Sequence, residues 1–173
     1  MASEGRFDLS DKKEIPTGTI NAIIAMYQLA LSKALGSGSA ALTQLILREV
    51  TKIADEMLKD LGVELGDVED LEKDIPKIFK LTGVSEKVEV EVSGDKASSG
   101  SVYTIKVYDS VFKPVALLLQ RKGIKFTLSP ESFIAAYVIR KVLRKKNAKA
   151  NVRIQVEPMK SPEEPLIIKV IVR

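Results

Sequence analysis

The spacing of apolar residues changes from a helical period to a strand period near residue 86, and this change constrains the fold more than any other feature. Residues 87–92 and 102–108 each alternate apolar and polar side chains, as half-buried strands do. The first helix is instead marked by apolar residues spaced three or four positions apart, at Ile20, Ile23, Ile24, Tyr27 and Leu31. The chain therefore predicts separate blocks of helices and strands.

The order of these blocks indicates the fold class. Helices are expected at about 19–32, 41–61 and 68–81, strands at 87–92 and 102–108, helices at 115–121 and 129–145, and strands at 151–156 and 166–172. Because helices and strands come in runs, an α+β fold is favoured, with an antiparallel sheet of about four strands packed against helices. We expect a flexible N-terminal arm over residues 1–18 and a single domain over residues 19–173.

Two segments carry apolar residues where a solvent-facing element would not. Residues 166–172 are apolar on both faces for most of their length, which predicts a central strand or one covered on both sides. Residues 19–32 carry no charge. This helix is therefore either central to the core or buried against a partner subunit.

Two prolines mark predicted helix starts. Ser129, Pro130 and Glu131 supply an N-cap hydroxyl, a proline at the first helical position and an acid in the first turn. Pro76 lies inside the segment 68–81, and a proline in mid-helix is costly because it lacks the N–H donor. We therefore predict that a new first turn begins at Pro76.

The absence of histidine, cysteine and tryptophan restricts the chemistry of the chain. A Ser-His-Asp or Cys-His catalytic set is impossible, as is a zinc, iron–sulfur or haem site built on His or Cys ligands. The remaining ionisable residues form no tight cluster in the sequence, so we expect a non-enzymatic protein without metal or cofactor. Glu64, Asp67, Glu69 and Asp70 do not have the spacing of a calcium-binding loop and predict a solvated acidic turn.

The sequence also predicts the compartment. No apolar run approaches the roughly 18 residues of a membrane span, and the polar N-terminus does not resemble a signal peptide. We expect a cytoplasmic protein without membrane contact, and the lack of cysteine agrees because no disulfide framework can form. Many Lys and Glu residues without Cys are also common in proteins of thermophiles.

The net charge of +4 is unevenly distributed along the chain. Residues 49–74 are strongly acidic, whereas residues 113–153 are basic and contain a single acid, Glu131. This division favours three alternatives: a face that binds nucleic acid or another polyanion, two surfaces that attract each other in an oligomer, or two solvated helix faces. The candidate polyanion-binding residues are Arg140, Lys141, Arg144, Lys145, Lys146, Lys149 and Arg153. Exposed aromatic rings, which single-strand binders use, are not interleaved with them.

Several segments together resemble a known domain. Residues 40–58 correspond to its long early helix, residues 71–83 followed by 88–92 to its helix, Gly-Val and strand pattern, and residues 132–143 to its late helix. Residues 152–156 and 166–172 correspond to its closing hairpin. In this layout, residues 20–173 resemble the small α+β ligand-binding domain shared by 4-vinyl reductase domains and TRAPP trafficking-complex subunits, to whose superfamily the haem nitric-oxide sensor domains also belong.

The resemblance does not extend to the binding residues of that family. Cysteines often found in its late helix and closing hairpin are replaced here by residues such as Val156, Glu157, Ile167 and Ile168, and the glycines usual on its early helix are missing. No family binding residue is therefore carried over. The resemblance implies a dimer-forming domain that holds a small apolar ligand or serves as a scaffold.

Two functional hypotheses follow. The first is a homodimer formed through residues 19–61 that binds a small apolar ligand or scaffolds a partner. If the family layout holds, some of the aromatic residues line an apolar cavity between helices and sheet, although a place in the core or its rim is the simplest interpretation of them. The candidate ligand-binding residues are Tyr27, Tyr103, Phe133 and Tyr137. The second hypothesis is the binding of nucleic acid or another polyanion through the basic face of residues 140–153.

Overall fold

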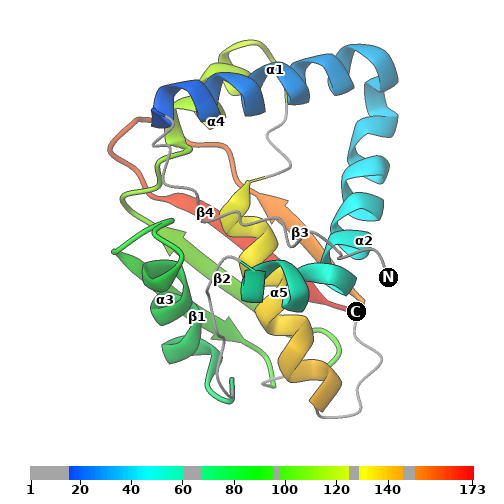
Figure 1. Ribbon diagram of the computed structural model, residues 1–173, viewed down its shortest axis with the longest axis vertical. Coiled ribbons are helices and arrows are strands. Elements are labelled where there is room, and N and C mark those ends of the chain that lie inside the picture. Colours follow the sequence, from blue (N-terminus) through cyan, green and yellow to red (C-terminus); the bar gives the residue numbers. More distant parts are fainter. Residues whose placement is uncertain (1–15, 61–67, 96–97, 125–128, 146–150) are drawn as a thin grey trace, which may run out of the picture.

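The computed structural model describes residues 16–60, 68–95, 98–124, 129–145 and 151–173 and has an α+β fold (Figure 1). Its elements, in chain order, are α1 (Thr17–Leu35), the short 3-10 helix η1 (Gly36–Gly38), α2 (Ser39–Asp60), α3 (Leu71–Leu81), β1 (Val88–Ser93), β2 (Val102–Val107), α4 (Lys113–Arg121), α5 (Pro130–Lys145), β3 (Val152–Val156) and β4 (Leu166–Val172). The predicted class and order are confirmed. Residues 1–15 of the predicted arm lie outside the described residues, and α1 begins at Thr17.

The four strands form one antiparallel sheet in the order β1-β2-β4-β3. One row of apolar side chains crosses it: Val90 pairs with Ile105, Ile105 with Ile168, and Ile168 with Val156. β4 lies between β2 and β3, which confirms the prediction of a central strand. The final hairpin therefore places β3 at the edge of the sheet.

The core lies between one face of the sheet and the helices α5 and α3. Figure 1 shows α5 lying across the sheet, while α3 packs against both β1 and α5. The largest side chains with almost no exposure include Phe79 of α3, Leu143 of α5 and the sheet residues Tyr103, Ile105 and Ile168. The opposite face of the sheet is partly open and carries the ion pairs Glu91–Lys106 and Glu157–Lys169. The alternation of apolar and polar residues along the strands thus produced one buried and one polar face.

The helices α1 and α2 form an extension beside this core. α1 packs against α4 and continues through η1 into α2, which descends next to α5 (Figure 1). Ile20, Ile23, Met26 and Tyr27 are exposed on α1, whose buried residues are Ala25 and Gln28. Of the two alternatives for the uncharged residues 19–32, a central place in the core is therefore wrong, and burial against a partner subunit stays a prediction. Among the residues that the structure describes, no helix is long and apolar enough to cross a membrane.

The prediction for Pro76 was also wrong, because Pro76 lies inside α3 and does not begin a helical turn. The start of α3 is instead made by two carboxylates. The Asp70 side chain accepts the N–H of Glu72 at 3.2 Å, and the Asp74 side chain accepts the N–H of Asp70 at 3.0 Å. The helix continues past Pro76 because residues on both sides of it, such as Ile75, are buried in the core.

The predicted start of α5 is confirmed. Ser129 precedes the helix and its hydroxyl oxygen accepts the N–H of Ser132 at 3.1 Å, while Pro130 is the first helical residue. The Ser129 side chain is fully buried, so this bond satisfies a helix N–H that water cannot reach.

We expect Ser129→Ala to lower the free energy of unfolding by about 1 kcal/mol, because it removes the N-cap of the helix that covers the sheet. Urea denaturation followed by circular dichroism measures the change. Ser99→Ala is the matched control, since Ser99 is exposed in the turn before β2. Equal stability of the two variants would contradict the capping role of Ser129.

Candidate functional site

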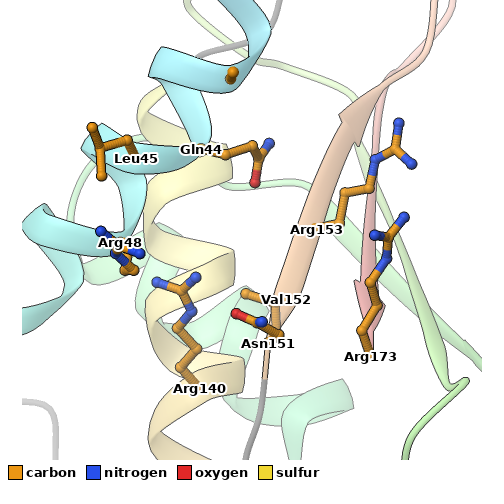
Figure 2. A pocket seen from close by; sticks show the side chains of 9 residues that line it. Gln44, Leu45, Arg48, Arg140, Asn151, Val152, Arg153 and Arg173 are labelled. Carbon is orange, nitrogen blue, oxygen red and sulfur yellow. The ribbon is translucent and has the colours of Figure 1, made fainter.

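A cleft of about 430 Å³ lies where α2, α5 and the edge strand β3 approach one another (Figure 2). Its lining residues come from these three elements, from the residue before β3 and from the residue after β4: Ala41, Gln44, Leu45, Arg48, Arg140, Asn151, Val152, Arg153 and Arg173. Figure 2 shows Arg48 and Arg140 on the side of the helices and Arg153 and Arg173 on the side of the strands. Four guanidinium groups thus line a single cleft.

The packing of α2 on α5 brings Arg48 and Arg140 together. Arg140 is only 8% exposed, whereas Arg48 is exposed at the surface of α2. Burial lowers the pKa of Arg140, and the positive charges of Arg144 and Arg48 lower it further. The amide of Gln44 on α2 donates to the carbonyl of Ile154 at 3.5 Å and so connects α2 with β3. These contacts hold the helix side of the cleft.

Strand pairing places the other two arginines. Arg153 of β3 pairs with Ile171 of β4, and the N–H of Arg173 donates to the carbonyl of Asn151 at 2.7 Å. Because side chains alternate along strands, Arg153 and Arg173 point to the same face of the sheet as diagonal neighbours. That face is opposite α5, since the intervening Val152 is buried in the core. The cleft therefore wraps around the exposed edge of β3.

The charges of the cleft favour an anion. None of the described residues that line it is acidic. Beside the cleft, the carboxylate of Glu49 accepts a hydrogen bond from Nε of Arg48 at 3.1 Å, and both side chains of this ion pair are at least half exposed. An exposed pair of this kind contributes about 0–1 kcal/mol, so an incoming anion can replace it. The lining supplies guanidinium and amide donors, and we find no nucleophile or general base among these residues.

The predicted polyanion-binding residues occupy three different settings. Arg140 and Arg153 line the cleft. Arg144 and Lys145 are exposed at the end of α5, while Lys141 is half-buried with Nζ 3.4 Å from the Tyr137 hydroxyl. Lys146 and Lys149 lie outside the described residues. Their role in polyanion binding stays a prediction.

Sequence reasoning missed Arg48 and Arg173. Arg48 stands directly before the acidic stretch of the chain, and Arg173 follows an apolar strand, so neither belongs to a basic cluster in the sequence. The one sequence signal that could have singled out these two residues was their type, because arginine is much rarer than lysine in this chain.

The predicted ligand-binding aromatic residues divide into two groups. Tyr103 of β2 and Tyr137 of α5 are buried in the core, and Phe133 of α5 packs against the same core. Tyr27 is 47% exposed on α1. The structure thus brings three of the four residues to the layer between sheet and helices, and their binding role stays a prediction.

A second polar cluster, also missed from the sequence, surrounds Glu131 in the first turn of α5. Glu131 is fully buried, one of its carboxylate oxygens accepts from the Ser110 hydroxyl, and the other has no hydrogen-bond partner in the described part of the chain. Burial raises the pKa of Glu131, although hydrogen bonds from Ser110, from its own N–H and from Ser129 oppose the shift. We therefore expect the stability of the fold to depend on the protonation of this carboxyl group.

Comparison with known proteins gives one clear relative. The chain is 31% identical over 142 residues to the uncharacterized protein MJ0312 of Methanocaldococcus jannaschii, in an alignment that covers 78% of this chain and 68% of that protein. No protein-family profile matches the chain, and no solved structure matches it.

We expect stability to fall as the pH rises above 4.5, the ordinary pKa of the Glu131 side chain. Between this value and the higher pKa of the folded state, the folded chain binds more protons than the unfolded chain, so the free energy of unfolding decreases. Glu131→Gln removes the titrating group and should reduce that decrease. Urea denaturation at about pH 5 and about pH 8 measures it.

The control for this prediction is Glu86→Gln, because Glu86 is exposed and its substitution should leave the pH dependence unchanged. An unaltered pH dependence in Glu131→Gln would show that Glu131 does not titrate in this range.

Proposed function

We propose that this chain, which belongs to the same protein family as the uncharacterized protein MJ0312 of Methanocaldococcus jannaschii, is a non-enzymatic binding protein for nucleic acid or another polyanion. The observation that carries the proposal is the cleft with four lining arginines and no acid among its described lining residues. A phosphate-bearing ligand releases its counterions when such a site neutralises it, and this release drives binding.

The surroundings of the cleft support the same function. Arg144 lies one helical turn after Arg140 on α5, and the adjacent Lys145 is exposed, so positive charge continues from the cleft along the helix. The amides of Gln44 and Asn151 add uncharged donors. This arrangement favours binding over catalysis because the described lining residues offer donors to an anion and include no nucleophile that would attack it.

We expect the protein to bind DNA or RNA at low salt, with an affinity that falls steeply as salt is added. Arg153→Gln should weaken binding and reduce the slope of log affinity against log salt by about one, because it removes one phosphate contact. Gel-shift titration at several salt concentrations measures both quantities. The matched control is Arg121→Gln, an equal charge change at an exposed arginine outside the cleft.

Two results would contradict this function. The first is no affinity at low salt for the wild-type protein. The second is an equal loss in Arg153→Gln and Arg121→Gln, because binding would then depend on total charge and not on the cleft.

A second candidate function is a homodimeric scaffold or small-ligand-binding domain that associates through residues 19–61. Four large apolar side chains are exposed on the uncharged part of α1: Ile20, Ile23, Met26 and Tyr27. Contiguous apolar surface of this kind marks interaction sites in soluble proteins. The resemblance to 4-vinyl reductase and TRAPP-subunit domains supports the same proposal, since it implies dimer formation and a small apolar ligand.

We expect the wild-type protein to be a dimer at micromolar concentration and Ile23→Lys to be a monomer, because the charge would be desolvated in the interface. Leu81→Lys is a close control, since Leu81 on α3 and Ile23 are both 57% exposed. Light scattering reports the mass, and native mass spectrometry reports the subunit number together with any retained ligand. A monomeric wild-type protein would exclude this function.

A further inference from the structure

We infer that the arginine-lined cleft is a binding site for a small molecule that carries two or more linked phosphoryl groups, with one pair of arginines for each end of the oligophosphate. This inference rests on the proposed anion binding and adds the size and the chemistry of the ligand. Three observations carry it: the cleft is lined by arginine and not by lysine among its described residues, the four arginines form two pairs, and the cleft has the dimensions of a small-molecule site.

The positive charges that line the cleft belong to arginine side chains. The chain contains seven arginines and twenty lysines, yet four of the arginines line the cleft and no lysine is among its described lining residues. Positive charge alone would be supplied equally well by lysine. Arginine differs because its planar guanidinium donates parallel N–H bonds that match two oxygens of a phosphoryl group. The lining thus fits recognition of oxygen geometry in addition to charge.

The four arginines form two pairs. Arg48 and Arg140 face each other across the contact between α2 and α5, closely enough that the charge of Arg48 lowers the pKa of Arg140. Arg153 and Arg173 are diagonal neighbours on the outer face of the sheet. The exposed edge of β3 separates the pairs, with Asn151 and Val152 between them in Figure 2. In the proposed binding mode, a ligand with one phosphoryl group occupies one pair, and a ligand with two or more linked groups contacts both.

The dimensions of the cleft suit a small molecule. Its volume of about 430 Å³ lies within the range of about 300–1,000 Å³ typical of small-molecule sites. Ala41, Leu45 and Val152 line it with apolar surface, and Gln44 and Asn151 with amides. These groups suit the uncharged part of a ligand such as a nucleoside diphosphate, whose phosphates the arginines would hold.

The first experiment compares four probes by isothermal titration calorimetry: inorganic phosphate, inorganic pyrophosphate, AMP and ADP. We expect pyrophosphate to bind at least about tenfold more tightly than phosphate, and ADP at least about tenfold more tightly than AMP, because in the proposed binding mode only the diphosphates contact both pairs. A difference between ADP and pyrophosphate reports whether the nucleoside contributes. Equal affinities of mono- and diphosphates would overturn the inference.

The second experiment uses arginine-to-lysine substitutions, which keep the charge of the protein. Arg48→Lys and Arg153→Lys alter exposed residues, one from each pair, and leave the net charge unchanged. We expect each to weaken pyrophosphate binding about tenfold, because lysine cannot donate a bidentate pair of hydrogen bonds. Arg121→Lys, outside the cleft, is the control and should bind as the wild type does. Thermal melting verifies that all three variants fold. Full affinity in both cleft variants would overturn the inference.

A competition assay separates this inference from the proposed function. We expect pyrophosphate to displace a single-stranded oligonucleotide without terminal phosphates, since both use the cleft. If the oligonucleotide binds but pyrophosphate neither binds nor displaces it, the ligand is a polymer and the inference fails while the proposed function stands. If neither probe binds at low salt, both fail.

Discussion

The burial of one face of the sheet beneath α5 and α3 is the interaction on which the rest of the structure depends. β4 occupies the centre of the sheet, and Leu166, Ile168 and Val170 on its inner face are completely buried. Each such side chain contributes about 1.5–3 kcal/mol relative to an exposed one. Because only one face is covered, the register is also specified. A shift by one residue would turn Lys169 towards the core and expose the apolar row.

The arginine-lined cleft is a consequence of this register. The alternation that buries Val152 and Val172 turns Arg153 and Arg173 to the outer face. The same packing places α5 beside the edge strand, so that Arg140 lines the cleft. Arg48 lines it from α2, which packs on α5. Four like charges around one cleft repel each other, and the pKa of Arg140 is lowered first by burial and then by the charges of Arg144 and Arg48. Local structure that opposes stability in this way is expected where a protein binds a ligand of opposite charge.

The position of α1 beside the core could not be predicted from the apolar pattern of that helix alone. The uncharged stripe of α1 was equally compatible with the core and with a partner, because periodicity identifies an apolar face and not what covers it. Pro76 is a second such case. Its own propensity favoured a helix start, but the hydrogen bonds of Asp70 and Asp74 and the burial of Phe79 set the helix boundaries instead. At Pro76, tertiary packing overrode local preference.

The sequence by itself determined the α+β class, the order of the elements, the central position of β4 and the N-cap at Ser129, because these follow from periodicity and from hydrogen bonds within a few residues. Arg140 and Arg153 were also found from the sequence, as members of a basic cluster. Only the tertiary structure decided that α1 lies beside the core, that Glu131 is buried, and that Arg48 and Arg173 join the other two arginines in one cleft. These four arginines are distant in the sequence, and they come together only because the packing of α2 on α5 and the pairing of β3 with β4 fold separate segments against one another.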